Sequence, residues 1–248
     1  MPSSIAIACQ NIQFNNILAI VFDKDGTLED SAAYWQAVAA ERARLIEAEV
    51  PGVEAQLIMA FGAGKNHFDP QGLMAVGSRY ENEIAAAAYI TAKDRSWQDS
   101  KLIARLAFNK VDKSKYFVKT PQLSPLYQEV KETLQLLAAQ GLKLAVLSAD
   151  SSSAVNAFII NHQLQEYLQL GMGTDGEISK PNPALFWEAC KRLEVLPEQT
   201  LMVGDSEADM LMGQAAGAAG TIGIVRNPDY PLESAPLKID SLQAIQIL

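Results

Sequence analysis

Short apolar runs alternate with amphipathic stretches in much of the chain, and this pattern predicts β-strands followed by α-helices. The run Ile17 to Phe22 is apolar throughout, as expected for a strand buried on both faces. Further strands are predicted at Leu142 to Leu147, Thr200 to Val203 and Thr221 to Val225. The predicted helices of this part cover Leu126 to Gln140, a segment after Ser153, Ala184 to Leu193 and Glu207 to Ala219. Such alternation indicates a mostly parallel sheet.

A block without strand signals separates the first predicted strand from the others. Apolar residues recur there at three-and-four spacing, which predicts helices at Ala32 to Glu49, Val53 to Phe61, Leu73 to Ala92 and Trp97 to Asn109. We therefore predict an α/β fold with a Rossmann-like, mostly parallel sheet core. The core would comprise residues 1–28 plus 119–248, and residues 29–118 would form an inserted all-helical domain.

Length and composition fit a soluble enzyme. The chain has 248 residues, 49% of them hydrophobic, which is enough for a sizeable core. Its net charge of −9 disfavours nucleic acid and anionic membranes as partners, and no apolar stretch is long enough to span a bilayer. Two distant cysteines without a metal-type spacing suit a reduced, cytoplasmic protein. The patch Ile5 to Cys9 is predicted to add an edge strand.

Two acidic residues follow the first predicted strand. In an extended chain Asp23 and Asp25 share one face, and Lys24 points to the other. Two carboxylates so close repel each other unless a cation lies between them or one keeps its proton. A polar turn is the alternative interpretation, because Asp25-Gly26 is also a common turn signal.

Two further candidates come from strand ends and helix starts. Ser148 directly follows the strand Leu142 to Leu147, where its hydroxyl and the amino end of the next helix could bind phosphate. Alternatively, Ser148 belongs to a helix cap. Lys180 precedes the helix that begins near Ala184, a place where a cation is unfavourable unless an anion lies nearby. The alternative for Lys180 is a solvated surface lysine.

The strand Thr200 to Val203 leads into a second acidic segment. Asp205 and Asp209 are four residues apart, and with Asp23 and Asp25 nearby they would make the site strongly anionic. Oxygen ligands of this kind favour Mg²⁺. Asp205 is alternatively a helix N-cap.

Taken together, these segments resemble the haloacid dehalogenase-like hydrolases, which are mostly phosphatases. The first motif is Asp23-Lys24-Asp25-Gly26-Thr27-Leu28, followed by Asp30-Ser31, and the others are Ser148, Lys180 before Pro181, and Gly204-Asp205 with Asp209. The motifs occur in the family's order. The style of the motifs and the place of the insertion are most similar to the phosphoglycolate phosphatase-like branch.

The resemblance implies a role for each residue. Asp23 would be the nucleophile that forms an aspartyl-phosphate, and Asp25 the general acid and base. Mg²⁺ would be bound by Asp23, Asp205 and the carbonyl of Asp25, with Asp209 orienting its ligands. The expected phosphate-binding residues are Ser148, Ala149 and Lys180, with Lys180 also screening the nucleophile.

The inserted domain would act as a cap that selects a small phosphorylated metabolite, such as a phosphorylated acid or sugar. Lys65 and Arg79 are possible substrate contacts there, although both also suit an exposed surface. His162 is expected on the surface. A phosphomutase and a non-catalytic binding protein stay open as alternatives; Trp35 stands where mutases of this family carry a histidine. A dehalogenase is disfavoured, because only an alkoxide leaving group needs the proton that Asp25 supplies.

Overall fold

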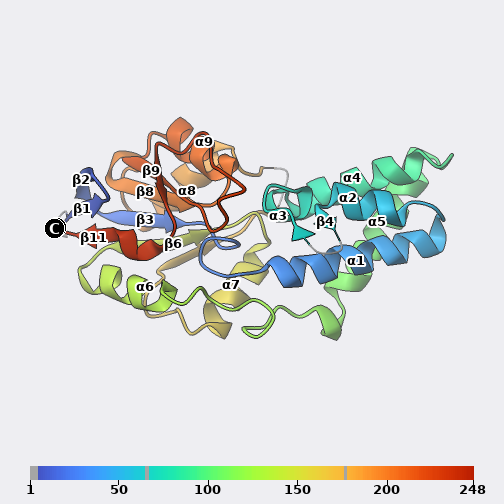
Figure 1. Cartoon of the computed structure of the whole chain (residues 1–248), viewed down its shortest axis with the longest axis horizontal. Coiled ribbons are helices and arrows are strands. Elements are labelled where there is room, and N and C mark those ends of the chain that lie inside the picture. Colours follow the sequence, from blue (N-terminus) through green and yellow to red (C-terminus); the bar gives the residue numbers. More distant parts are fainter. Residues whose placement is uncertain (1–4, 65–66, 176–177) are drawn as a thin grey trace. The chain divides into compact units, whose positions relative to one another are not determined.

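The computed structural model describes residues 5–64, 67–175 and 178–248, and Figure 1 shows its helices and strands. The chain divides into two compact units. The first, here the core unit, comprises Met1–Asp30 and Leu126–Leu248; the second, the inserted unit, is Ser31–Pro125. The functional division predicted at residues 28 and 118 stays a prediction.

The core unit contains a parallel sheet of six strands in the order β10-β9-β8-β3-β6-β7. Every neighbouring pair is parallel, so the predicted α/β class is confirmed. The strands are β3 (Ala19–Phe22), β6 (Lys143–Leu147), β7 (Leu170–Met172), β8 (Thr200–Gly204), β9 (Gly220–Ile224) and β10 (Leu237–Ile239). The first of these in sequence, β3, lies near the middle of the sheet, between β6 and β8.

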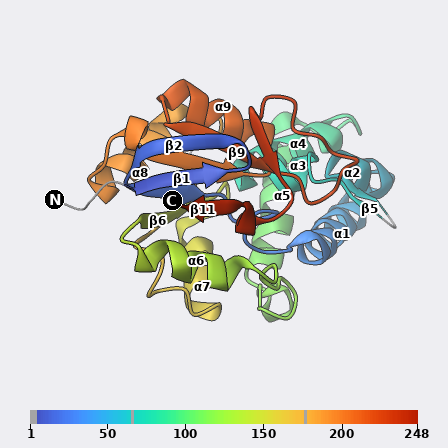
Figure 2. The ribbon, with the colours of Figure 1, turned by 60° about the vertical axis from the view of Figure 1, so that its left-hand side comes forward.

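Helices cover both faces of this sheet (Figures 1 and 2). Along β3, Ile20 and Phe22 belong to one apolar cluster, and Ala19 and Val21 belong to another. The first cluster packs against α6 (Val130–Ala139) and α7 (Ser152–Asn161), and the second against α8 (Pro183–Leu193) and α9 (Glu207–Ala216). Burial on both faces explains why β3 is apolar at every position.

The N-terminal segment differs from the prediction. The strand β1 (Ile5–Cys9) is the central strand of a separate antiparallel sheet, between β2 (Ile12–Ile17) and β11 (Ile245–Ile247). It is therefore not an edge strand. The apolar run predicted as one strand is also divided, since Ile17 ends β2 and Ala19 begins β3. Within β2, Asn16 takes a left-handed conformation (φ 60°). Asparagine tolerates this conformation better than most residues.

Among its described residues the inserted unit is helical apart from one short hairpin, which the prediction of an all-helical domain did not include. Its helices include α1 (Ala32–Glu49), which has the predicted limits. The others are α2 (Glu54–Ala60), α3 (Leu73–Val76), α4 (Arg79–Thr91) and α5 (Trp97–Asp112), and the hairpin pairs β4 (Ala63–Gly64) with β5 (His67–Phe68). The unit has a core of its own, in which the rings of Phe61 and Phe108 meet edge to face at 6.2 Å.

Local capping explains where predicted helices break or end. The helix predicted over Leu73 to Ala92 is divided, because Ser78 caps α4 in a reciprocal capping box with Glu81. α6 begins later than predicted, since Leu126 pairs with Glu29 in a β-bridge. In the part of the chain that the structure describes, three short 3-10 helices complete the elements: η1 (Lys115–Phe117), η2 (Pro197–Gln199) and η3 (Leu242–Ala244). Within the described ranges, no helix is long and apolar enough to cross a membrane.

Candidate active site

Three neighbouring strands of the parallel sheet end in polar residues at one edge. Asp23 follows β3, Ser148 follows β6 and Asp205 follows β8. The backbone N–H of Asp23 donates to the carbonyl of Val203 at 2.8 Å, which continues the β3–β8 pairing as far as the acidic residue. Since ligands bind at the carboxyl ends of strands in open α/β sheets, this edge is the candidate active site.

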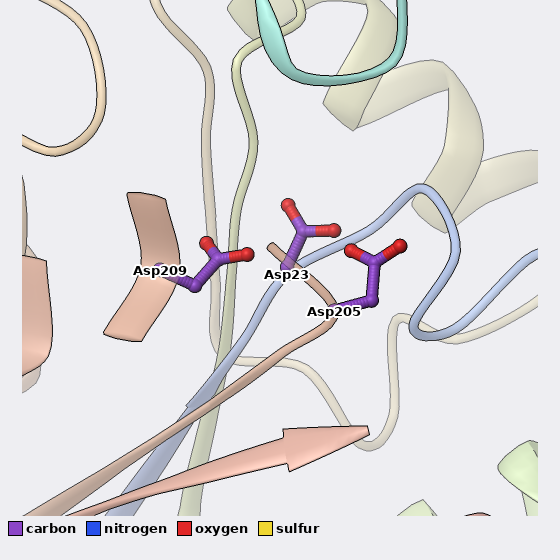
Figure 3. Close-up of side chains that lie close together, drawn as sticks. All are labelled: Asp23, Asp205 and Asp209. Atoms are coloured by element: carbon purple, nitrogen blue, oxygen red, sulfur yellow. The ribbon is translucent and has the colours of Figure 1, made fainter. Parts of the chain in front are cut away.

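Three carboxylates gather there into what we call the carboxylate cluster: Asp23, Asp205 and Asp209 (Figure 3). Each offers one oxygen, and these three atoms all lie within 4.8 Å of one another. Asp23 and Asp205 come from the loops after two strands, and Asp209 comes from the first turn of α9. Asp23 and Asp209 are buried, and Asp205 is half-buried.

Two glycines give the carboxylates room. Gly26 has a left-handed conformation (φ +75°), and a β-carbon there would lie 1.9 Å from Oδ2 of Asp205. At Gly204, a β-carbon would lie 2.4 Å from Oδ2 of Asp209. Both distances are far inside van der Waals contact, so the positions of two carboxylates depend on these residues having no side chain.

The electrostatics of the carboxylate cluster favour a bound cation. Burial raises the pKa of Asp23 to about 7; Asp209 and Asp25 act in the same direction, and the Lys180 ammonium acts against them. Burial also raises the pKa of Asp205 well above its usual range, and the charges of Asp23 and Asp209 add to this effect. A divalent cation between the carboxylates would offset this repulsion. Buried carboxylate oxygens are ligands that Mg²⁺ prefers, so the donor set fits that ion.

Lys180 joins two members of the cluster. Its Nζ lies 2.5 Å from Oδ1 of Asp23 and 2.7 Å from Oδ1 of Asp209, and the side chain is 4% exposed. Burial alone would lower the pKa of Lys180, but the charges of Asp209 and Asp23 raise it above its ordinary value. The residue is thus a buried cation beside the candidate nucleophile, and the alternative of a solvated surface lysine is wrong.

Asp209 is fixed by its own helix as well. Its Oδ2 accepts a hydrogen bond from the Ser206 hydroxyl at 2.6 Å, and the Ser206 backbone N–H donates to the same atom at 3.2 Å. Ser206, rather than Asp205, is the N-cap of α9. The carboxylate of Asp205 is therefore not used as a helix cap.

Ser148 is 2% exposed, directly beyond β6. Its hydroxyl oxygen accepts a hydrogen bond from the backbone N–H of Asp150 at 3.1 Å. The cap of α7 is Ser151, which accepts from the N–H of Ala154 at 3.2 Å. Ser148 therefore is not the helix cap, and Ala149 beside it is half-buried.

Lys24 differs most from its predicted position. Its side chain is fully buried, and its Nζ lies 2.6 Å from Oδ2 of Asp25, 2.9 Å from Oε1 of Glu29 and 3.4 Å from Oδ2 of Asp150. We call these four residues the Lys24 cluster. The prediction that Lys24 points away from Asp25 is wrong, because alternation holds only in an extended strand and β3 ends at Phe22. The chain turns there, and the N–H of Leu28 donates to the carbonyl of Lys24.

His162 is also more buried than predicted. Its side chain is 7% exposed, and its Nε2 lies 3.5 Å from Oε2 of Glu29. The imidazole packs on the ring of Phe158, with 5.0 Å between the ring centroids. The surface prediction for His162 is therefore wrong; its spacing of four residues from Phe158 is the signal that would have placed it on the buried face of α7.

Arg226, which follows β9, was not among the predicted site residues. Its guanidinium carbon lies 3.8 Å from the ring centroid of Tyr127, and its Nη1 donates to Glu129 at 2.7 Å. Its Nη2 donates to the carbonyl of Thr27 at 3.0 Å. Arg226 thus anchors the loop that carries Asp25. The rule that polar residues at strand ends converge, applied to β9, would have found it.

The two predicted cap residues have different outcomes. Lys65 lies outside the described residues. Arg79 begins α4, and its guanidinium donates to Glu83, Asn109 and Asp112 at 2.7 Å each. Its charge is therefore engaged inside the inserted unit, and a substrate contact by Arg79 stays a prediction.

Comparison with known proteins agrees with this geometry. The model of the haloacid dehalogenase-like hydrolase family matches residues 17–217. A phosphoglycolate phosphatase from Aliivibrio fischeri is 34% identical over 206 residues, which cover 82% of both chains. The phosphoglycolate phosphatase of Yersinia pestis is 27% identical over 88% of this chain and 85% of its own.

A similar fold occurs in the crystal structure of a haloacid dehalogenase-like phosphatase from Thermococcus onnurineus. The TM-score is 0.65 at 18% sequence identity, over 92% of this chain and 95% of the other. The matched region of the family model includes Asp23, Ser148, Lys180 and Asp205. The chain therefore belongs to the haloacid dehalogenase-like hydrolases.

Proposed function

We propose that the chain is a Mg²⁺-dependent phosphatase that hydrolyses a small phosphomonoester through an aspartyl-phosphate on Asp23. The proposal rests on the surroundings of Asp23. This buried carboxylate lies in the carboxylate cluster, and the Lys180 ammonium is 2.5 Å from its Oδ1. A cation so close screens the carboxylate as an anionic substrate approaches.

The reaction takes place in two steps. In the first, a carboxylate oxygen of Asp23 bonds to phosphorus while the bond from phosphorus to the ester oxygen breaks, and Asp25 gives its proton to the departing alkoxide. In the second, the oxygen of a water molecule bonds to phosphorus while Asp25 takes a proton from that water, and the bond from phosphorus to the Asp23 oxygen breaks. Inorganic phosphate leaves, and both aspartates return to their first state.

The other residues of the site neutralise the charge of the phosphate or hold the reacting groups in place. Lys180 and the Ser148 hydroxyl contact the phosphate oxygens, assisted by the backbone at Ala149. Asp23, Asp205 and the carbonyl of Asp25 would hold Mg²⁺, and Asp209 would orient this arrangement through its contacts with Lys180 and Ser206. When bound, Mg²⁺ neutralises the charge that develops on the transferred phosphoryl group.

We infer that the substrate is a small phosphorylated acid or sugar. The relatives named phosphoglycolate phosphatase support this substrate class, and residues 29–118 are proposed as the cap that selects within it. In the inserted unit, Trp35 lies edge to face with Tyr34 at 5.0 Å, and Nζ of Lys119 is 5.0 Å from its ring centroid. An indole held in this way lacks the imidazole expected of a mutase.

The test is phosphate release from a panel that includes 2-phosphoglycolate, sugar phosphates, nucleotides and p-nitrophenyl phosphate, with and without Mg²⁺. We expect release only with the metal and only from small phosphomonoesters. Asp23→Asn should abolish turnover while its circular dichroism stays that of the wild type, because the amide is nearly isosteric but cannot attack phosphorus.

Other outcomes would contradict the proposal. Wild-type activity in Asp23→Asn would show that Asp23 is not the nucleophile. Interconversion of sugar phosphates without net phosphate release would identify a mutase. Binding of Mg²⁺ and phosphate by the wild type, with no turnover of any ester, would instead indicate a non-catalytic binding protein.

A further inference from the structure

The Lys24 cluster is a second charged group at the same edge of the sheet, and the proposed reaction uses only its Asp25. The Lys24 side chain has no exposed surface, yet three carboxylates lie within 3.4 Å of its Nζ. Two of them, Asp25 and Glu29, belong to the loop after β3, and Asp150 belongs to the loop after β6. One ammonium group therefore joins the loop of the nucleophile to the loop of Ser148.

The two buried lysines divide the acidic residues of the edge into two sets. Lys180 pairs with Asp23 and Asp209, inside the carboxylate cluster. Lys24 pairs with Asp25, whose contact of 2.6 Å is the shortest in its own cluster. Asp25 is only two residues from Asp23, so without an attraction elsewhere its carboxylate would be a further ligand for a cation in the carboxylate cluster.

We propose that Lys24 is a positioning residue, whose ammonium holds the Asp25 carboxyl apart from the carboxylate cluster and in the place needed for proton transfer. The proposal rests on the proposed phosphatase function. The carboxyl group of Asp25, unlike its backbone carbonyl, must be free of the metal to exchange a proton with the leaving group, and its position must be fixed to within a fraction of an ångström for that transfer to be efficient. Glu29 and Asp150 hold the ammonium in turn.

The test is Lys24→Met, which keeps the length of the side chain and removes its charge. The measurement is kcat/KM for two substrates: the best alkyl phosphate of the panel, and p-nitrophenyl phosphate. An alkoxide needs a proton to leave, whereas p-nitrophenolate leaves without one, so departure of the leaving group depends on the position of Asp25 only for the alkyl ester. kcat/KM includes the step in which the leaving group departs.

A matched control is Lys143→Met. Lys143 begins β6 at the opposite end of the strands, where its Nζ donates to the carbonyl of Leu193 at 2.5 Å. This variant also loses a lysine charge from the sheet, but far along the strand from the candidate site. Its melting temperature shows the effect of such a loss on stability, and its ratio of kcat/KM for the two substrates should equal that of the wild type.

We expect Lys24→Met to lower kcat/KM for the alkyl ester at least roughly tenfold more than for the aryl ester. The difference is a part of the rate acceleration that general acid catalysis by Asp25 supplies. Equal losses for both esters would mean a purely structural role and would overturn the proposal. A ratio that shifts in favour of the alkyl ester would also overturn it, since Lys24 would then oppose protonation of Asp25 rather than position it.

Removing Lys24 leaves three acidic residues without their cation, so the single variant can fail to fold. The double variant Lys24→Met with Glu29→Gln removes one positive and one negative charge, and the same preferential loss on the alkyl ester is expected of it. A wild type that hydrolyses neither ester would contradict the proposed function itself. A wild type that hydrolyses both, with an unchanged ratio in the variants, contradicts only the role of Lys24.

Discussion

At Gly26 two conditions exclude a larger residue. The backbone has φ +75°, and the place of a β-carbon is taken by the carboxylate of Asp205. Gly217 has nearly the same backbone, φ +76°, but nothing lies within 4 Å of its β-carbon position. The two glycines therefore separate the effect of backbone strain from the effect of a displaced metal ligand.

We predict that Gly217→Ala lowers the free energy of unfolding by about 1–2 kcal/mol, the cost of a left-handed conformation. Gly26→Ala should lower it by more, because its methyl group also meets Asp205. Only Gly26→Ala should also weaken Mg²⁺ binding in titration calorimetry, because the new methyl group displaces Asp205. Equal Mg²⁺ affinity in the two variants would contradict the inference that Gly26 leaves room for the Asp205 carboxylate.

Lys180 supports the second residue-scale prediction. In Lys180→Met the buried carboxylates of Asp23 and Asp209 lose their cation, and breaking a buried ion pair costs roughly 3–5 kcal/mol. We expect a large fall in melting temperature without metal and partial recovery with Mg²⁺, whose charge would replace that of the ammonium.

The control is Lys191→Met, whose side chain is 81% exposed and lies 3.9 Å from Glu188. A surface pair of this kind contributes little, so its melting temperature should stay near that of the wild type with and without Mg²⁺. A Lys180→Met variant that behaves like this control would show that Lys180 does not stabilise the cluster.

At the scale of elements, Arg226 connects three segments that are distant in sequence. It stacks on Tyr127, pairs with Glu129 before α6, and donates to carbonyls of Thr27 and Asp240. These contacts need a planar group with several donors, which a lysine ammonium does not provide.

We therefore predict that Arg226→Lys lowers the free energy of unfolding by about 1–3 kcal/mol, because it removes hydrogen bonds made by a charged group, and this is the typical cost of losing such bonds. It should also lower kcat, since the carbonyl of Thr27 fixes the loop that carries Asp25. Urea denaturation and steady-state kinetics test both effects. Arg44→Lys is the control, because Arg44 is exposed and pairs only with Glu41 among the contacts described for it.

The elements that sequence predicts well are those with a strong local period. The limits of α1 and the positions of β6, β8 and β9 follow from apolar spacing alone. The break before α4 depends instead on the capping box of Ser78, which interrupts an otherwise continuous helical pattern. The role of β1 was not predictable from its own residues, since its partner β11 comes from the far end of the chain.

The positions of side chains, too, are predictable only where a local pattern determines them. The positions of Asp23, Ser148 and Asp205 follow from the rule for strand ends. Lys24 and His162 do not, because Lys24 meets Glu29 through the turn after β3 and His162 meets it from a distant part of the sequence. Their burial depends on a turn and on tertiary packing.

At the scale of the whole molecule, the two units have separate apolar cores. Phe108 lies in the core of the inserted unit, and Phe186 lies under the parallel sheet of the core unit. All three members of the carboxylate cluster belong to the core unit. Loss of packing in one core should therefore affect cation binding differently from loss in the other.

We predict that Phe108→Ala and Phe186→Ala each cost about 3–5 kcal/mol of stability. Phe108→Ala should keep the Mg²⁺ affinity of the wild type in titration calorimetry. Phe186→Ala should weaken it, because α8 packs on the sheet and directly follows the segment of Lys180. Loss of Mg²⁺ binding in Phe108→Ala alone would show that the cation is held by the inserted unit.

The place of β3 in the sheet has a consequence for biosynthesis. Its two neighbours, β6 and β8, are encoded more than a hundred residues later, so the ribosome releases β3 well before either neighbour exists. At about 5–20 residues per second, the nascent chain carries this apolar segment unpaired for on the order of ten seconds or longer. During that interval the inserted unit can already fold, whereas β3 is a natural binding segment for a chaperone.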